Sequence, residues 1–194
     1  MTKIRRTSRV SKQQWLAKAL EVFIQNGEPG INIELLAREI GVAKAGFYWH
    51  FKDRAELLDQ LLDYWSDEYT GVITNNVAVL ELPAAERLLT IMEMIEEHDL
   101  AGLDLHFHVW ARKDAKVARK VQKVIRERLD YLRNTFAELG FSGDEVEMRA
   151  RLFLAYEANE SLMFRFKTRG QVKRLQQRRW RQYLRLPQDK SPSS

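Results

Sequence analysis

Residues able to support enzyme chemistry are few in this chain, and their spacing is poor. It contains no cysteine, which excludes disulfides, thiolate zinc sites, iron–sulfur clusters and cysteine nucleophiles. His106 and His108 are two residues apart and lie on different sides of a helix, so His98, Asp104, His106 and His108 form no metal site. No Ser–His–Asp set, acid pair or phosphate loop is recognisable. We therefore expect a non-enzyme with no catalytic residue, no metal and no cofactor.

The charged side chains point to binding instead. The 194 residues carry a net charge of +5, but residues 1–64 carry +2, residues 65–164 carry −6 and residues 165–194 carry +9. Such an imbalance suggests different partners for the ends and the middle, although a basic segment alone does not separate nucleic acid from an acidic lipid or protein surface. No apolar run approaches the roughly 18 residues that span a bilayer. The basic residues 1–10 also lack the apolar core of a secretory signal, so we expect a cytoplasmic protein with no membrane partner.

The elements that must position these side chains are helices. Ser11 and Gln14 form a capping box that opens the first helix, and Gly27, Pro29 and Gly30 end it. A second capping box is expected where residues 141–146 open a helix. Apolar spacing predicts the helices 33–40, 44–50, 55–69, 83–97, 100–112, 114–139, 144–167 and 171–186, with a linker at 75–83. The sequence predicts an all-α fold.

Residues 33–50 fit a helix-turn-helix motif. Gly41 permits the tight turn between two short helices, and Ala37 is small where the helices cross. Leu36, Ile40 and Phe47 supply apolar contacts between them. In such a motif the second helix enters the DNA major groove while the first crosses the backbone. Helical hairpins buried in a core share this spacing, so the motif alone is only moderately specific.

The run from Gly41 to Leu58 closely resembles the signature of the tetracycline-repressor (TetR) family of bacterial transcription regulators. The similarity includes Tyr48-Trp49-His50-Phe51 and the Lys52-Asp53-Arg54 start of the next helix, and it covers about residues 11–65. Beyond that only the helical layout matches, with a loose pattern at residues 110–114 and Arg128. The resemblance implies an N-terminal three-helix helix-turn-helix domain followed by a C-terminal helical bundle for ligand binding and dimerisation.

The resemblance also implies which residues contact DNA. By residue type these are base readers at the start of the recognition helix, then aromatic and histidine side chains along it, then a cationic phosphate clamp. They are Lys44, Ala45 and Gly46, then Tyr48, Trp49 and His50, then Lys52 and Arg54. Ala43 replaces the usual capping serine and Gly46 replaces a threonine or serine. A missing cap costs about 0.5–2 kcal/mol and a helical glycine about 1 kcal/mol, so this helix is expected to be soft.

Each of these residues also has a purely structural interpretation. For Phe51 we favour a core position, because aromatic residues at helical spacing usually pack inside. His50 is divided between a DNA contact and an internal hydrogen bond. The alternative for Lys52 and Arg54 is that they are ordinary solvated surface charges without a role in DNA binding. For Tyr48 and Trp49 we favour exposure toward DNA.

The C-terminal half is expected to hold an unknown small-molecule effector and to form the homodimer. The expected pocket lining shares helix faces: Leu103, His106, Phe107, Trp110, Tyr156 and Glu160. Core packing explains its aromatic residues equally well. Helices 114–139 and 144–167 are the expected dimerisation elements, because the second is apolar nearly all round.

Both ends of the chain are basic. Residues 1–12 precede the helix-turn-helix and are expected to lie along a phosphate strand of DNA or in its minor groove. Residues 165–190 carry ten cations. For these we favour a surface helix that docks Leu175, Trp180 and Leu184 while its arginines face solvent or the acidic middle of the chain. The alternative is an extra contact to DNA or to another acidic surface.

The sequence as a whole predicts a sequence-specific regulator of transcription. We expect residues 1–54 to bind DNA, residues 55–74 to connect, residues 75–186 to bind ligand and dimerise, and residues 187–194 to form a loose tail. The expected partners are a palindromic double-stranded operator, a second copy of the chain and a small effector that releases a repressor. The alternative is a ligand-independent DNA-binding protein of low specificity.

Overall fold

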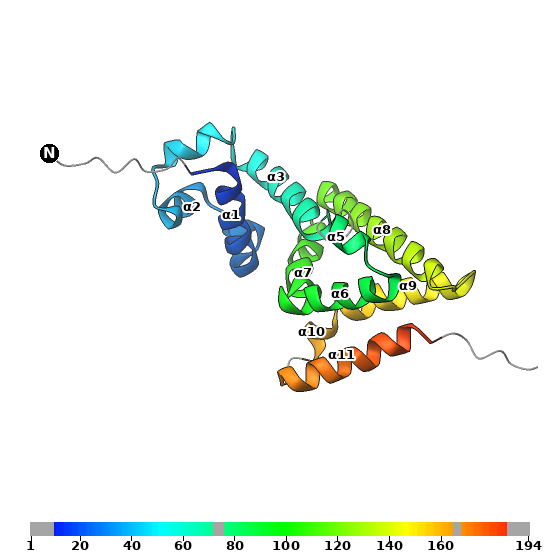
Figure 1. The fold of residues 1–194 in the computed structure, drawn as a ribbon. Coiled ribbons are helices and arrows are strands. Elements are labelled where there is room, and N and C mark those ends of the chain that lie inside the picture. Colours follow the sequence, from blue (N-terminus) through cyan, green and yellow to red (C-terminus); the bar gives the residue numbers. More distant parts are fainter. Residues whose placement is uncertain (1–9, 72–75, 165–167, 186–194) are drawn as a thin grey trace, which may run out of the picture.

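The computed structural model describes residues 10–71, 76–164 and 168–185, and this part of the chain is entirely helical and turn structure without strands. It divides into a head, which we define as residues 10–53, and a body of residues 76–185, with a connecting helix between them (Figure 1). Within the described residues, no helix combines the length and apolar character needed to cross a bilayer.

The head contains α1 (Lys12–Asn26), the short η1 (Glu28–Gly30), α2 (Ile33–Ile40) and η2 (Lys44–Trp49). The predicted capping box of α1 is confirmed. Gln14 N–H donates to the Ser11 hydroxyl at 3.2 Å, and Ser11 N–H donates to the Gln14 side chain at 2.8 Å. The Asn32 side chain caps α2 by accepting from Leu35 N–H at 3.1 Å. Short-range hydrogen bonds thus set where these helices begin.

The connecting helix α3 (Arg54–Ser66) continues into a π-helical turn, η3 (Asp67–Gly71). Its N-cap is Asp53, whose carboxylate accepts from Glu56 N–H at 2.9 Å. Trp65 near the end of α3 is almost fully buried. Since α3 begins in the head and ends inside the body, any change in its tilt moves one relative to the other.

The body contains the remaining helices. In chain order these are α5 (Val77–Leu80), α6 (Ala84–Glu97), α7 (Leu100–Ala111), α8 (Ala115–Glu138), α9 (Asp144–Glu157), α10 (Glu160–Met163) and α11 (Arg169–Tyr183). The helices α8 and α9 form an antiparallel hairpin, and α11 lies across the far side of α6 (Figure 1). The indole Nε1 of Trp180 fixes α11 by donating to the Ala85 carbonyl at 2.7 Å.

Two buried apolar clusters hold the molecule together. The first fills the head and continues along α3 to Phe107 of α7 and the first half of α8. Phe107 stacks on Trp65 with ring centroids 4.3 Å apart and contacts Phe23 of α1 at 4.6 Å. The second cluster lies among α6, the end of α8, α9 and α11. The head and the near end of the body therefore share one continuous core.

Three local predictions were wrong. The expected linker at 75–83 contains α5, which Asn76 caps through Ala78 N–H. The expected capping box before α9 is not formed. Gly143, at φ 56°, occupies the N-cap position without a side-chain bond. The expected helix 144–167 ends at Glu157 and resumes as α10. At this break the Asn159 side chain donates to the Ala155 carbonyl at 2.7 Å, the kind of local bond by which asparagine competes with helix. The predicted loose tail at 187–194 and most of the basic arm lie outside the described residues.

Candidate nucleic-acid interface

The turn between α2 and η2 is closed by Gly41. Its backbone is left-handed, at φ 81° and ψ 33°. The amides of Gly41 and Val42 both donate to the Ala37 carbonyl, at 3.0 and 2.9 Å. A residue with a side chain is disfavoured in this conformation, so glycine here lets the chain turn directly into η2.

The expected recognition helix is present as a 3₁₀ helix rather than an α-helix. Ala43 stands at its N-cap and gives no side-chain bond. Within it, Phe47 is fully buried, edge-on to Trp15 at 5.5 Å and stacked on Phe51 at 5.0 Å. The core position predicted for Phe51 is confirmed, since this residue is 2% exposed. Phe47 and its aromatic neighbours therefore fix which face of η2 points inward.

With Phe47 inward, the next two side chains point outward. Tyr48 is 53% exposed and Trp49 is 72% exposed. Large aromatic side chains at such exposure are unusual on a monomer surface and favour a binding face. The exposure that we predicted for both residues is found.

The cations of this face differ in whether their side chains are already paired. Lys44, at the start of η2, is exposed but forms an ion pair with Glu34 of α2. Lys52 is exposed just before α3, where its backbone N–H donates to the Glu56 carboxylate at 2.6 Å. Between them, Ala45 is exposed and Gly46 half-buried, so this part of η2 presents little more than backbone.

His50 and Arg54 are turned inward. The His50 ring bonds to the Val10 carbonyl through Nε2 at 2.8 Å, which is the internal alternative. The Arg54 guanidinium donates to the carbonyls of Ile31 at 2.8 Å and Glu28 at 2.6 Å and pairs with the Glu28 carboxylate. Arg54 thus fastens the loop between α1 and α2. We therefore interpret both residues as positioning residues rather than phosphate contacts.

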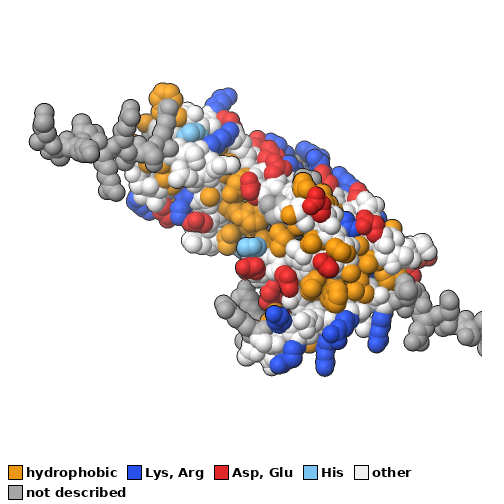
Figure 2. Space-filling model, viewed as in Figure 1, with side chains coloured by type: hydrophobic (Ala, Val, Ile, Leu, Met, Phe, Trp, Pro, Cys, Tyr) orange, Lys and Arg blue, Asp and Glu red, His pale blue; other side chains and the backbone are white. Residues whose placement is uncertain are grey.

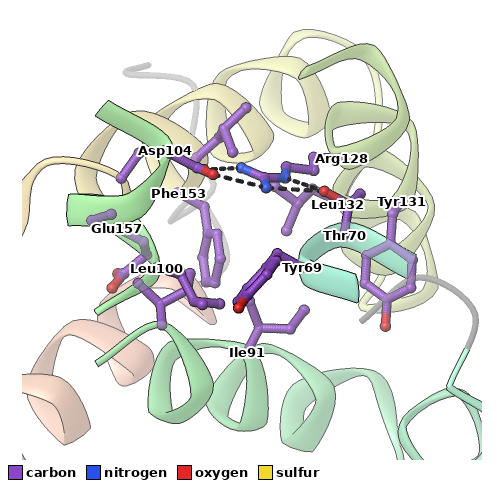
Figure 3. A pocket seen from close by; sticks show the side chains of 14 residues that line it. Tyr69, Thr70, Ile91, Leu100, Asp104, Arg128, Tyr131, Leu132, Phe153 and Glu157 are labelled. Atoms are coloured by element: carbon purple, nitrogen blue, oxygen red, sulfur yellow. Dashed lines mark hydrogen bonds and ion pairs between the residues drawn. The ribbon is translucent and has the colours of Figure 1, made fainter. Parts of the chain in front are cut away.

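The body contains a cavity bounded by η3, α6, α7, α8 and α9, with about 570 Å³ of space, part of it open to solvent (Figure 3). Its walls are mainly apolar. The lining residues are Tyr69, Thr70, Ile91, Ile95, Leu100, Ala101, Asp104, Arg128, Tyr131, Leu132, Phe153, Leu154, Glu157 and Ala158. Asp104 and Arg128 form an ion pair on its wall, beside Thr70.

The six residues expected to line a pocket are not among these lining residues. Leu103 and Phe107 are buried in the core that joins head and body, and Trp110 packs against it. The His106 ring bonds to the Gly102 carbonyl at 2.9 Å. Tyr156 is exposed, and Glu160 is buried in an ion pair with Arg179. The face of α7 that we chose meets α1 and α3, whereas the face with Leu100, Ala101 and Asp104 borders the cavity.

Comparison with known proteins agrees with this geometry. Residues 16–61 match the family model of bacterial regulatory proteins of the tetR family. An uncharacterized HTH-type transcriptional regulator of Pseudomonas putida, TtgW, is 36% identical over 52 residues, which is 27% of this chain and 39% of that protein. The chain thus matches about two fifths of this relative's length. The head of this chain is therefore similar to bacterial regulatory proteins of the tetR family.

Solved structures resemble the head and the body together in fold. A TetR regulator from Legionella pneumophila superposes with a TM-score of 0.72 at 16% identity, over 95% of this chain and 100% of that one. FadR from Bacillus subtilis, in complex with stearoyl-CoA, superposes with a TM-score of 0.67 at 17% identity, over 90% and 98% of the two chains. At such identities the likeness establishes the fold alone.

Sequence reasoning missed the cavity's charged wall. Asp104 is the one carboxylate within the largely apolar helix Leu100–Ala111, and a buried acid of this kind requires a partner. That signal was available, but the partner, Arg128, lies 24 residues away on another helix. Only the packing of α7 against α8 brings the two together.

Proposed function

We propose that this TetR-family chain is a homodimeric, sequence-specific regulator that binds a palindromic operator through its head and releases it when a small molecule fills the body cavity. The observation that carries the proposal is the face of η2, where Tyr48 and Trp49 stand exposed on a buried aromatic support. In this division residues 1–54 contact DNA, residues 55–74 connect, and residues 75–186 bind effector and dimerise.

The proposed DNA contacts follow the exposure of the side chains. Lys44 exchanges Glu34 for an acceptor on DNA, with guanine the best fit for a lysine at the start of η2. The small residues Ala45 and Gly46 allow the η2 backbone to approach the groove closely. Tyr48 and Trp49 contact bases or phosphates along η2, and Lys52 contacts the phosphate backbone.

The proposed dimer face lies on α9 and its neighbours. Met148, Leu152 and Tyr156 are spaced by four residues along α9 and are 55%, 56% and 40% exposed. Leu175 of α11 is also exposed. An exposed apolar stripe on a helix favours burial against a second copy, and a two-fold pair places two recognition helices on one palindrome about 34–36 Å apart.

The outer face of α8 favours a different role from the one we predicted. Its exposed positions are occupied by cations at helical spacing rather than by apolar residues. These cations are Lys116, Arg119, Lys123 and Arg126. We therefore assign the dimer contact to α9 and α11 rather than to α8.

The proposed release mechanism depends on α3 and α7, which contact both regions. Phe107 of α7 packs on Phe23 of the head, while Asp104, nearly one turn earlier, borders the cavity. A ligand that binds better in one tilt of α3 shifts the population toward it, and by reciprocity DNA weakens ligand binding. The apolar cavity wall suits an apolar ligand, and the similar FadR structure holds stearoyl-CoA.

The test is selection of binding sites from a randomised DNA pool near physiological salt. Tyr48→Ala and Lys52→Ala remove two proposed contacts, and Lys173→Ala on exposed α11 is the charge-matched control. A single palindromic motif, kept by the control and lost in both head variants, supports the proposal. Enrichment of no motif would overturn it.

The alternative function, DNA binding of low specificity, is favoured by α11. Figure 2 shows Lys and Arg side chains in a row along α11, and the exposed cations of α11 and of the residues just after it include Arg174, Arg178, Arg181 and Arg185. Under this alternative, binding falls steeply with salt, ignores the Tyr48 change and is weakened by neutralising α11.

The dimer face is tested by light scattering on Leu152→Glu, with Val109→Glu as a control at an equally exposed apolar site on α7. We expect Leu152→Glu to give a monomer and Val109→Glu to stay dimeric. A dimeric Leu152→Glu would place the interface elsewhere.

A further inference from the structure

Among the described residues that line the cavity, Arg128 is the one cation, and its charge is already neutralised. The guanidinium forms an ion pair with Asp104 through Nη1 and a second, longer bond at 3.3 Å through Nη2. Its Nε and Nη2 also donate to the Thr70 hydroxyl at 3.1 and 2.9 Å. Figure 3 shows these bonds side by side at the cavity wall. Arg128 is therefore held on two sides by other elements of the fold.

Both carboxylate oxygens of Asp104 likewise have hydrogen-bond partners. Besides Arg128, its carboxylate accepts the indole N–H of Trp65 at 2.9 Å. Asp104 is 6% exposed. A carboxylate at this depth is stable as an ion only while its cation remains in place.

The other charged group on the wall is also paired. Glu157 accepts two bonds from Arg179, at 2.7 and 2.9 Å, and one from the Tyr183 hydroxyl at 3.1 Å. Arg179 is shared with Glu160, at 3.1 Å. Burial raises the pKa of Glu157, and the neighbouring Arg179 opposes this shift. Among the described lining residues, no ionised side chain is left without a counter-charge.

We propose that the cavity selects an uncharged, apolar ligand, and that Asp104 sets this selectivity by occupying Arg128. This inference rests on the proposed function, in which the same cavity receives the effector. Asp104 acts here as a specificity-determining residue, and the class of ligand is a neutral chain or ring without an ionised head group inside the cavity.

The physical reason is the cost of exchange. An organic carboxylate that binds Arg128 must displace either Asp104 or Thr70, and in both cases two buried carboxylates are left to share one guanidinium. An amine has to compete with Arg179 for Glu157 in the same way. A neutral ligand avoids both costs, because it leaves the two ion pairs intact while covering the apolar wall.

The test compares three probes of equal chain length: octan-1-ol, octanoate and octylamine. Calorimetric titration of the full chain near neutral pH, without DNA, gives the ratio of their affinities. In the unmodified protein octan-1-ol should bind about tenfold or more tightly than either charged probe. Asp104→Asn keeps an acceptor for Trp65 but frees Arg128, so it should shift the octanol-to-octanoate ratio by about tenfold toward octanoate.

The matched control is Glu127→Gln. It removes the same charge next to Arg128 in sequence, but from the exposed face of α8, where Glu127 pairs with Lys123. Its affinity ratio should equal that of the unmodified protein. Circular dichroism and the melting temperature establish whether each variant is folded.

Several results would overturn the inference. One is octanoate or octylamine binding the unmodified protein as tightly as octan-1-ol, and another is an unchanged ratio in folded Asp104→Asn. Failure of both octan-1-ol and a second neutral probe, indole, to bind also contradicts it. Because these titrations contain no DNA, they stay separate from the operator selection. A chain that selects a palindrome but prefers octanoate refutes the inference alone.

Discussion

Replacing Gly41 and Gly46 by alanine, one at a time, should change the stability of the head in opposite directions. The two glycines lie five residues apart, one in the turn and one inside η2. Adding a methyl group at each tests whether the turn conformation and the softness of η2 have the origins that we assign to them.

The structure indicates the direction in which each substitution changes the free energy of unfolding. Gly41 has φ 81°, and an added Cβ meets no atom within 4 Å, so the effect comes from backbone strain alone. The left-handed conformation costs an alanine about 1–2 kcal/mol, against which a stiffer unfolded chain returns about 0.4–1 kcal/mol. We expect Gly41→Ala to lower the free energy of unfolding by about 1 kcal/mol.

Gly46 lies inside η2 without a positive φ, and an added Cβ there touches only the Trp15 ring, at 4.0 Å. That is ordinary van der Waals contact. Alanine lowers the conformational entropy of the unfolded chain, and no strain in the folded state opposes this effect. Gly46→Ala should therefore stabilise the head by about 0.4–1 kcal/mol. Binding to the selected operator should tighten by about two- to fivefold, because less ordering is left to the DNA.

Urea denaturation of both variants measures the difference, which we expect to be about 1–2 kcal/mol, or several degrees in melting temperature. Equal loss in the two variants would refute the assignment of η2 as softened by Gly46. A neutral Gly41→Ala would show that the turn does not require its left-handed residue.

Two further predictions concern charged side chains. Arg54→Met should lower the free energy of unfolding by about 1–2 kcal/mol, because its bonds to the loop carbonyls are lost, and leave the salt dependence of DNA binding unchanged. Lys52→Met should leave the stability unchanged and reduce the slope of log K for DNA binding against log salt concentration by about 1. Titrations with DNA at several salt concentrations measure this slope. If Arg54→Met reduced it and Lys52→Met did not, the roles of the two residues would be exchanged. Hydrogen bonds from Arg133, then from Arg151, lower the pKa of Glu147 from 4.5 to about 2. Its stabilisation is therefore present above pH 4.5 and lost as the pH falls toward 2, and Glu147→Gln should flatten that part of the acid denaturation curve. An unchanged curve would mean that this group titrates alike in the folded and unfolded chain.

The head was predictable because its signals are local. Ser11, Asn32 and Asp53 bond to amides three residues away, and Gly41 sets its own turn. Helical spacing was enough to place Phe51 inside, and the helix-turn-helix motif placed Trp49 outside. Such short-range patterns can be recognised in the sequence because they do not depend on how distant segments pack.

The body was less predictable because its sites depend on packing between distant helices. His106 and Phe107 follow Asp104 closely on α7. They nevertheless face the core that the head shares with the body, while Asp104 borders the cavity. Periodicity finds both faces of such a helix but does not say which neighbour each one meets. In the same way, Arg54 has the residue type of a phosphate contact, and only the position of the loop it bonds reveals its structural role.

The most direct test of the account is the ratio of two dissociation constants near physiological salt. The first is for the selected palindrome and the second for a scrambled duplex of equal length and composition. We predict that the palindrome binds about a thousandfold or more tightly, and that Tyr48→Ala removes most of this preference. A ratio near one, or a preference that survives loss of the exposed aromatic face, would contradict the claim that η2 reads a specific operator.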